Sequence, residues 1–352
     1  MSVRTTRVVT WYTCDQPLRQ FENSDYEMTS TINAGRRRFL GGMGGALACA
    51  VTSTFATEIK TVDKTVEKNQ GYVQVPGGRV WWQRFGSGSG TPLLMLHGGP
   101  GAGHDYLMPL EVLADERPVI FYDQLGCGLS DSPQDPSIYT IQRSVDELEA
   151  LRHALNLDDV ILYGHSWGSM LAIEYLCQGR GRGVRKLVLA GASPSVPQFV
   201  AGTRRLLAQM PHHEGARINE LYATGKGDTA EYQALVQHFY DLHLCRRKPT
   251  PPEVVKAFDT LGKSIAYKVM NGPNEFTVTG VMKDWNRHDD LARINMPTYL
   301  TTGQYDEVTL DCHEAIQRAV KGSRLQVFAG CSHLTMNEAP QTYAQAVRTF
   351  LA

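Results

Sequence analysis

The stretch Val160-Ile161-Leu162-Tyr163-Gly164-His165-Ser166-Trp167-Gly168 decides the fold of this chain. It places a G-x-S-x-G pattern between a short apolar run and a helix-like segment, residues 169–177, which is the setting of a nucleophile elbow. A serine hydroxyl is a weak nucleophile, so the turn must hold it clear of the backbone. Glycines two residues to either side remove the side chains that would clash there. Ser166 is therefore the predicted nucleophile.

The sequence around this turn predicts an α/β fold, with a mostly parallel sheet between helices. Short apolar runs alternate with segments of helical spacing, as in sheets covered on both faces. An entry hairpin is expected at residues 71–85, and helices are expected at 138–155 and 340–351. Six short, mostly apolar runs suit buried central strands, namely residues 92–96, 118–122, 160–163, 187–190, 298–302 and 325–328.

The alternation stops between about residues 195 and 290, where the sequence becomes helix-rich, charged and interrupted by prolines. We interpret residues 195–290 as a helical cap inserted into a core of residues 71–194 and 291–352. A cap at this position would cover the carboxyl ends of the strands, where open parallel sheets bind their ligands.

Residues 1–70 differ from the rest and are interpreted as a leader and linker. Arg36-Arg37-Arg38-Phe39-Leu40 precedes a weakly apolar, charge-free stretch, residues 41–56, and this resembles a twin-arginine export signal with cleavage after Ala50 or Ala56. The stretch is short and polar for a membrane span of about 20 apolar residues, so no stable membrane insertion is expected. The expected location is periplasmic or secreted, with a cytoplasmic location as the alternative.

The composition gives no sign of a macromolecular partner or a metal. The 352 residues include 35 Lys and Arg against 36 Asp and Glu, so no bulk field would attract nucleic acid. The seven cysteines form no C-x-x-C pair or zinc-like spacing. We therefore predict no metal and no cofactor, and a small ligand that is recognised locally. The oligomeric state does not follow from the sequence.

Two loops suit an oxyanion site, one after the predicted strand at 92–96 and the other the serine turn after the strand at 160–163. His97-Gly98-Gly99-Pro100-Gly101 follows the strand at 92–96, and its glycines let the backbone approach a substrate closely. Acyl transfer needs two N–H donors for the developing oxyanion. We assign these donors to the amides of Gly99 and Trp167, although an ordinary Gly-Pro turn explains the first loop equally well in isolation.

Two further loops carry the predicted partners of the serine. Asp306 follows the strand at 298–302, and His333 follows the strand at 325–328. The order Ser166, Asp306, His333 is the order found in α/β-hydrolases. His333 would take the serine proton, and Asp306 would orient the imidazole.

Two other residues compete for these roles by proximity. His165 adjoins the nucleophile, and its side chain is expected to point away from the serine at such a sharp turn. Glu307 could replace Asp306 as the orienting acid.

These motifs together resemble the proline iminopeptidases, which are serine peptidases of the α/β-hydrolase fold. The resemblance covers about residues 70–352. It is strengthened by the cap segment Met270-Asn271-Gly272-Pro273-Asn274-Glu275-Phe276-Thr277, which is similar to that of archaeal tricorn-associated aminopeptidases. The resemblance implies a serine hydrolase that releases an N-terminal residue, proline or another, from small peptides through an acyl-enzyme.

The resemblance also implies that acidic cap residues bind the free α-amino group of the substrate. Glu275 fits this role, because a carboxylate in a partly closed pocket favours an ammonium; a salt bridge between cap and core is the other interpretation. A second acid is expected near residues 239–246, where the chain instead continues into the cationic run Arg247-Lys248. This departure leaves an L-amino acid amidase as the alternative function. A carboxylesterase and a non-enzymatic binding protein are more distant alternatives.

Overall fold

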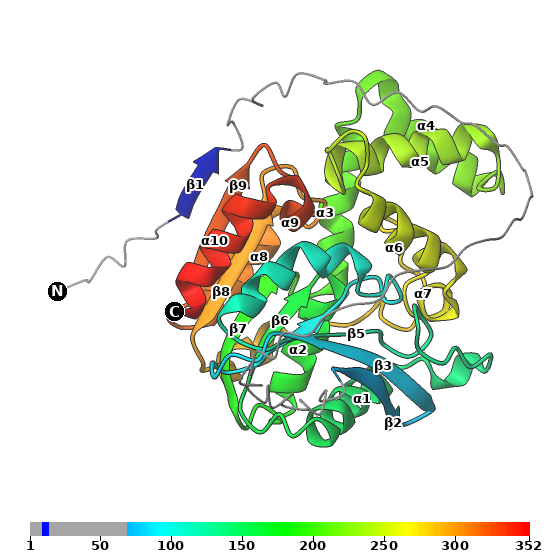
Figure 1. The fold of residues 1–352 in the computed structure, drawn as a ribbon. Helices are drawn as coiled ribbons and strands as arrows, with labels where there is room; N and C mark the ends of the chain where they lie inside the picture. The colour runs from blue at the N-terminus through cyan, green and yellow to red at the C-terminus, as the bar shows by residue number, and fades with distance from the viewer. Residues whose placement is uncertain (1–8, 14–68) are drawn as a thin grey trace, which may run out of the picture. The chain divides into compact units, whose positions relative to one another are not determined.

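A nine-stranded sheet forms the centre of the computed structural model, which describes residues 9–13 and 69–352 (Figure 1). The strands lie in the order β1-β9-β8-β7-β6-β4-β5-β3-β2. All neighbours are parallel except β2 with β3 and β3 with β5. The strands are β1 Val9–Thr13, β2 Gln70–Val75, β3 Gly78–Phe85, β4 Leu93–Leu96, β5 Val119–Tyr122, β6 Val160–His165, β7 Val184–Ala190, β8 Thr298–Gly303 and β9 Arg324–Ala329.

The predicted α/β architecture is confirmed. All six expected central strands are present, with small differences at their ends, and the expected entry hairpin is formed by β2 and β3. Gly77 adopts φ 97° in the hairpin turn, a conformation that glycine supplies without steric cost. Val9–Thr13 falls in the segment interpreted as a leader, and here it pairs with β9 as an edge strand.

The helices connect these strands and also build the cap. Around the sheet lie η1 Asp105–Asp115, η2 Pro136–Ile138, α1 Ile141–Ala154, α2 Trp167–Cys177, η4 His288–Arg293, α8 Leu310–Ala319, α9 Thr335–Glu338 and α10 Pro340–Leu351. Between β7 and β8 the chain forms α3 Val196–Ala208, η3 Pro211–His213, α4 Glu214–Ala223, α5 Ala230–His243, α6 Pro252–Lys263 and α7 Ile265–Met270.

Side chains alternate between the two faces of the sheet and feed two separate cores. In β4, Leu94 and Leu96 pack with residues of α1 and α2, whereas Leu93 and Met95 pack with residues of η1 and α10. This alternation is the two-residue period of a strand that is buried on both faces. The central strands therefore form a rigid frame whose carboxyl ends can hold loops in fixed positions.

The inserted cap has a small core of its own. Leu207, Ile218, Val236, Phe239 and Phe276 belong to one buried cluster contributed by α3, α4, α5 and the segment after α7. Figure 1 shows these helices gathered at one end of the sheet. Within the described ranges, no helix is long and apolar enough to cross a membrane. The predicted export signal, residues 35–56, lies outside the described residues.

Candidate active site

Ser166 stands at the sharp turn between β6 and α2. Its backbone has φ 53° and ψ −123°, a conformation that a non-glycine residue rarely adopts. The flanking glycines are needed because the chain is crowded there: a Cβ on Gly164 would lie 2.4 Å from the Gly168 carbonyl oxygen. A Cβ on Gly168 would lie 2.0 Å from the carbonyl oxygen of Leu96. The turn therefore holds Ser166 in a strained, fixed position, as the sequence predicts.

Asp306 and His333 form a buried pair on the loops after β8 and β9. His333 Nδ1 lies 2.7 Å from Asp306 Oδ1, and both side chains are almost fully buried. The other carboxylate oxygen of Asp306 accepts a hydrogen bond of 2.9 Å from the Thr302 hydroxyl, and Oδ1 also accepts the Val308 amide at 2.8 Å. Asp306 is thus held by three donors, and its partner imidazole is oriented through Nδ1.

Charge and burial act in opposite directions on this pair. Burial disfavours the imidazolium of His333, but the Asp306 carboxylate, together with Glu307 and Glu275, outweighs burial and raises the pKa of His333 to about 9. Burial likewise disfavours ionised Asp306, yet the adjacent His333 keeps the pKa of this carboxyl below its usual value. The pair favours the state in which a proton sits on the imidazole and the carboxylate stays charged.

Glu307, the competitor for the orienting position, lies on the other side of the imidazole. Its Oε1 is 3.8 Å from His333 Nε2, whereas Asp306 occupies the Nδ1 side. The two neighbouring acids therefore have different places, and the geometry leaves Asp306 as the residue that can orient the ring.

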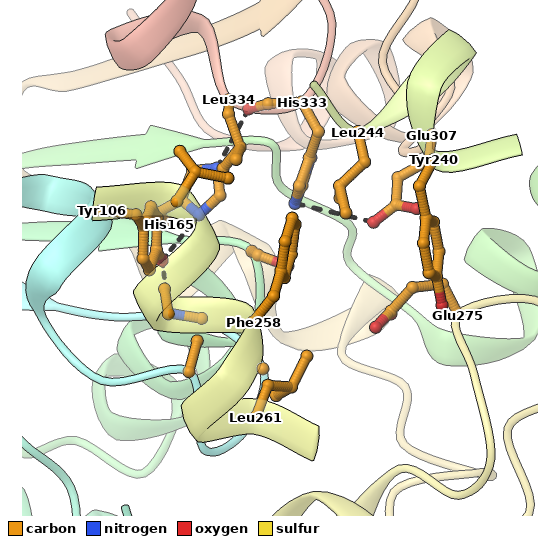
Figure 2. A pocket seen from close by; sticks show the side chains of 16 residues that line it. Tyr106, His165, Tyr240, Leu244, Phe258, Leu261, Glu275, Glu307, His333 and Leu334 are labelled. Atoms are coloured by element: carbon orange, nitrogen blue, oxygen red, sulfur yellow. Dashed lines mark hydrogen bonds and ion pairs between the residues drawn. The ribbon is translucent and has the colours of Figure 1, made fainter. Parts of the chain in front are cut away.

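His165 does not point away from the site as expected. Its ring lines the same pocket as Ser166, with its centroid 4.5 Å from that of His333 (Figure 2). Nδ1 lies 2.9 Å from the Tyr106 hydroxyl, and Nε2 lies 3.1 Å from the His333 carbonyl oxygen. Burial lowers the pKa of His165 to about 3. It is therefore a neutral support for His333, and both of its nitrogens are occupied.

Tyr106, from η1, joins this support to the glycine loop. Its hydroxyl accepts the Gly98 amide at 2.6 Å and is also bonded to His165. The sequence offers no signal for this tyrosine, because it reaches the site from an irregular 3₁₀ segment, interrupted by Pro109, that has no motif of its own.

Of the two predicted oxyanion donors, Trp167 follows Ser166 in the chain, and Gly99 belongs to the loop after β4 that passes beside the serine. Gly98 passes so close that a Cβ on it would be 3.0 Å from Ser166 Cβ, and Gly99 follows with φ 111°. The Gly98 amide is bound to Tyr106, which leaves Gly99 as the next amide of this loop. Trp167 is the first residue of α2, where an N–H has no acceptor within the helix. Its indole is held by Gln124 at 2.9 Å.

A cavity lies between these loops and the cap, and two carboxyl groups line it. Figure 2 shows Glu275 and Glu307 on the same side of His333, close to Tyr240. Glu275 Oε1 accepts a hydrogen bond of 2.6 Å from the Tyr267 hydroxyl. Glu307 is 2% exposed, and its Oε2 is buried without a hydrogen-bond partner among the described residues.

Burial raises the pKa of Glu275, and burial with the neighbouring Glu275 charge raises that of Glu307 well above its usual value. A buried carboxylate oxygen that lacks a partner is costly, so this corner of the cavity is built to receive a hydrogen-bond donor.

Residues 239–246, where the resemblance implied a second acid, place no carboxyl group in the cavity. The carboxyl group that lines it beside Glu275 is that of Glu307, from the loop after β8. The segment 239–246 instead contributes Tyr240 and Leu244 to the cavity wall, and Asp241 pairs with Lys248 outside it. The sequence did not indicate this position: adjacency to Asp306 made Glu307 a competitor for the orienting role, whereas its carboxyl group lies on the Nε2 side of the imidazole.

One group of buried side chains has the composition of a metal site. Ligand atoms of His97, Asp123 and Cys127 lie within 4.8 Å of one another. However, His97 Nε2 accepts a hydrogen bond from the Gln124 backbone amide. Asp123 Oδ1 accepts hydrogen bonds from the backbone amide and from the ring Nδ1–H of His104. These hydrogen bonds fix the loop after β5, a turn-anchoring role that aspartate side chains commonly have.

Comparison with known proteins agrees with this geometry. Residues 91–340 match the model of the alpha/beta hydrolase fold family. The chain is 39% identical over 290 residues to the proline iminopeptidase of Saccharolobus solfataricus, covering 82% of this chain and 93% of that protein. The crystal structure of VinJ matches with a TM-score of 0.77 and 33% identity, over 81% of this chain and 98% of that one. The crystal structure of a proline iminopeptidase from Mycobacterium smegmatis matches with a TM-score of 0.75 and 31% identity, over 80% and 97%.

The elbow, the buried acid–imidazole pair and the capped sheet define an α/β-hydrolase, and the chain belongs to that family. Within it, the chain belongs to the proline iminopeptidase family, as the resemblance of its motifs predicts.

Proposed function

We propose that this chain is a serine aminopeptidase that releases an N-terminal residue, proline or another, from small peptides. The observation that carries the proposal is one cavity lined by Ser166 and His333 and by two carboxyl groups, Glu275 and the buried Glu307. A catalytic serine alone serves many ester and amide substrates. The acid pair adds a site for a cation beside it.

In the proposed reaction, Ser166 Oγ attacks the carbonyl carbon of the first peptide bond and its proton passes to His333 Nε2. Asp306 stabilises the resulting imidazolium, and the amides of Gly99 and Trp167 donate hydrogen bonds to the oxyanion. The C–N bond breaks as His333 returns the proton to the leaving amine. Water then attacks the acyl-enzyme with His333 again as base, which frees the N-terminal residue and Ser166.

Glu275 and Glu307 would hold the free α-ammonium of the substrate. The unpartnered Oε2 of Glu307 gains a donor when an ammonium binds, and the tyrosine-bound Glu275 supplies the second acceptor. A substrate with a blocked amine brings neither the charge nor these hydrogen bonds. The site would therefore select the first peptide bond of a chain and reject internal ones.

Steady-state hydrolysis of L-proline arylamide and N-acetyl-L-proline arylamide tests this proposal. The wild type should prefer the free amine strongly, and Glu275→Gln and Glu307→Gln should each erode that preference by about tenfold or more, since a charged hydrogen bond contributes about 1.5–3 kcal/mol. Ser166→Ala should abolish turnover of both substrates. Equal rates for free and blocked substrates in the wild type would refute the aminopeptidase.

Two further substrates separate the remaining alternatives. L-Prolinamide also offers a free amine but has ammonia as its leaving group, and faster turnover of the amide than of a Pro-Xaa dipeptide would indicate an amidase. A simple ester that is hydrolysed faster than any free-amine substrate would indicate a carboxylesterase.

We also propose that the protein is exported through the twin-arginine pathway. The support is the sequence Arg36-Arg37-Arg38-Phe39-Leu40 and the weakly apolar stretch behind it. Cell fractionation of the wild type and of the Arg36→Lys/Arg37→Lys variant tests this. Retention of the wild type in the cytoplasm would contradict it.

A further inference from the structure

The last residue of cap helix α5, His243, makes three hydrogen bonds to the loops that carry Asp306 and His333. Its carbonyl oxygen accepts the amides of Glu307 and His333, each at 3.2 Å. Its Nδ1 lies 2.9 Å from the carbonyl oxygen of Tyr305. A carbonyl only accepts, so Nδ1 carries a hydrogen and donates it. His243 thus binds the residues directly before and after Asp306, as well as His333 itself.

These contacts are available because of where His243 lies in its helix. The last four carbonyl groups of an α-helix have no intrahelical N–H partner, and His243 ends α5. The next residue continues the contact, since Leu244 accepts the Leu334 amide at 3.0 Å. Leu244 also lines the cavity beside His333 and Glu307 (Figure 2). One short segment of the cap therefore joins both loops at the cavity wall.

Two kinds of contact set the relative position of the two loops: the Tyr305 amide donates directly to the Cys331 carbonyl oxygen at 2.9 Å, and His243 adds its bonds on either side of Asp306. They follow different strands, β8 and β9, and Ser166 follows a third, β6. Asp306 and His333 meet through one hydrogen bond of 2.7 Å. A small shift of either loop would move the imidazole relative to the serine, which is held by its own rigid turn.

We propose that His243 is a positioning residue, which sets the alignment of His333 with Ser166 by fixing the two loops through its carbonyl and its Nδ1–H. This inference rests on the proposed function, in which His333 is the base. It extends that function by making an element of the cap part of the catalytic alignment, in addition to its contribution to the substrate pocket.

Two substitutions separate the donor of His243 from its ring. His243→Asn keeps an N–H donor at the place of Nδ1 but lacks the ring. His243→Phe keeps a ring to pack against Phe239, whose centroid is 5.0 Å away, but lacks the donor. If the donor positions the loops, Asn should stay within about threefold of wild-type kcat. Phe should lose about tenfold or more with KM within about twofold, because a misplacement approaching 1 Å costs on the order of 100-fold in rate.

Labelling by phenylmethylsulfonyl fluoride gives a second readout, because it requires an aligned Ser166 and His333 but no ammonium site. Its rate should fall for His243→Phe in parallel with kcat and stay near wild type for His243→Asn. His238→Phe is the matched control: it lies on the same helix, and its Nδ1 contacts Glu214 inside the cap at 2.6 Å. It should leave kcat and labelling unchanged.

The outcomes distinguish the two proposals. A wild type that neither hydrolyses the arylamide nor reacts with the label refutes the proposed function. A reactive wild type with an equally reactive His243→Phe, or with a folded His243→Asn that loses tenfold in kcat, refutes the positioning role alone. Circular dichroism melting establishes which variants fold, and if His243→Phe does not, His243→Asn decides by itself.

Discussion

Replacing Gly191 by alanine should inactivate the site while leaving the fold in place. Gly191 directly follows β7, has φ 54°, and donates its amide to the Thr301 carbonyl at 2.9 Å. A Cβ at this position would lie 2.5 Å from Cε1 and 2.7 Å from Nδ1 of His333. Unstrained carbon contacts are about 3.5–4.0 Å, so the imidazole or the β7 end must move by about 1 Å.

The size of the effect follows from that displacement. A misplacement of about 1 Å in a reacting group costs on the order of 100-fold in rate. The left-handed backbone adds roughly 1–2 kcal/mol of strain for alanine, which lowers stability but does not itself touch the imidazole. We therefore expect kcat/KM to fall about 100-fold or more, with a modest decrease in melting temperature.

Gly179→Ala is the matched control for this substitution. Gly179 also has a positive φ, 78°, but a Cβ there would meet nothing within 4 Å. It should carry the backbone strain without the loss of activity. The assay is steady-state hydrolysis of L-proline arylamide, with thermal melting of each variant. The reasoning is refuted if Gly191→Ala keeps wild-type kcat/KM, or if Gly179→Ala loses as much activity.

Four other perturbations have expected outcomes. His333 acts as a base only when neutral, and its pKa is raised to about 9. The rate at which a sulfonyl fluoride labels the serine should therefore increase as the pH rises through that range. Glu307→Gln removes a carboxyl group 3.8 Å from Nε2 of His333, so the increase in labelling rate should occur at lower pH in this variant. Arg287→Met leaves the buried Glu174 carboxylate without two hydrogen bonds of 2.6 Å, and should lower the free energy of unfolding in urea by about 2–4 kcal/mol. Leu162→Ala in the centre of β6 should cost about 2–5 kcal/mol in the same assay, through the cavity it leaves.

The parts of the fold and site that follow from the sequence are those with a local signal. The strands could be predicted because parallel strands buried on both faces are continuous apolar runs, and α10 because its spacing matches one helical face. The pairing of Asp306 with His333 could be predicted from chain order, since loops that follow parallel strands emerge at one sheet edge.

The remaining features depend on how distant segments meet. Glu307 lies beside Asp306 in sequence, but only the backbone conformation of the loop after β8 directs one carboxyl to Nδ1 and the other to the Nε2 side of the same imidazole. Tyr106 and His243 contribute through a hydroxyl and a helix-terminal carbonyl, and neither group is encoded in a motif. Residue identity alone does not indicate which backbone carbonyl will meet which amide.

The charges around His333 connect substrate selection with catalysis under the proposed function. Glu307 and Glu275 favour the protonated imidazole, as Asp306 does, and a protonated imidazole cannot accept the proton of Ser166. An ammonium bound between the two glutamates would neutralise their effect and lower the pKa of His333, so the correct substrate would help to produce the active base. A blocked substrate would lack both the ion pairs and this activation. Relative to the free-amine substrate, the blocked substrate should therefore have a lower kcat as well as a higher KM. A change confined to KM would show that the acid pair serves binding alone.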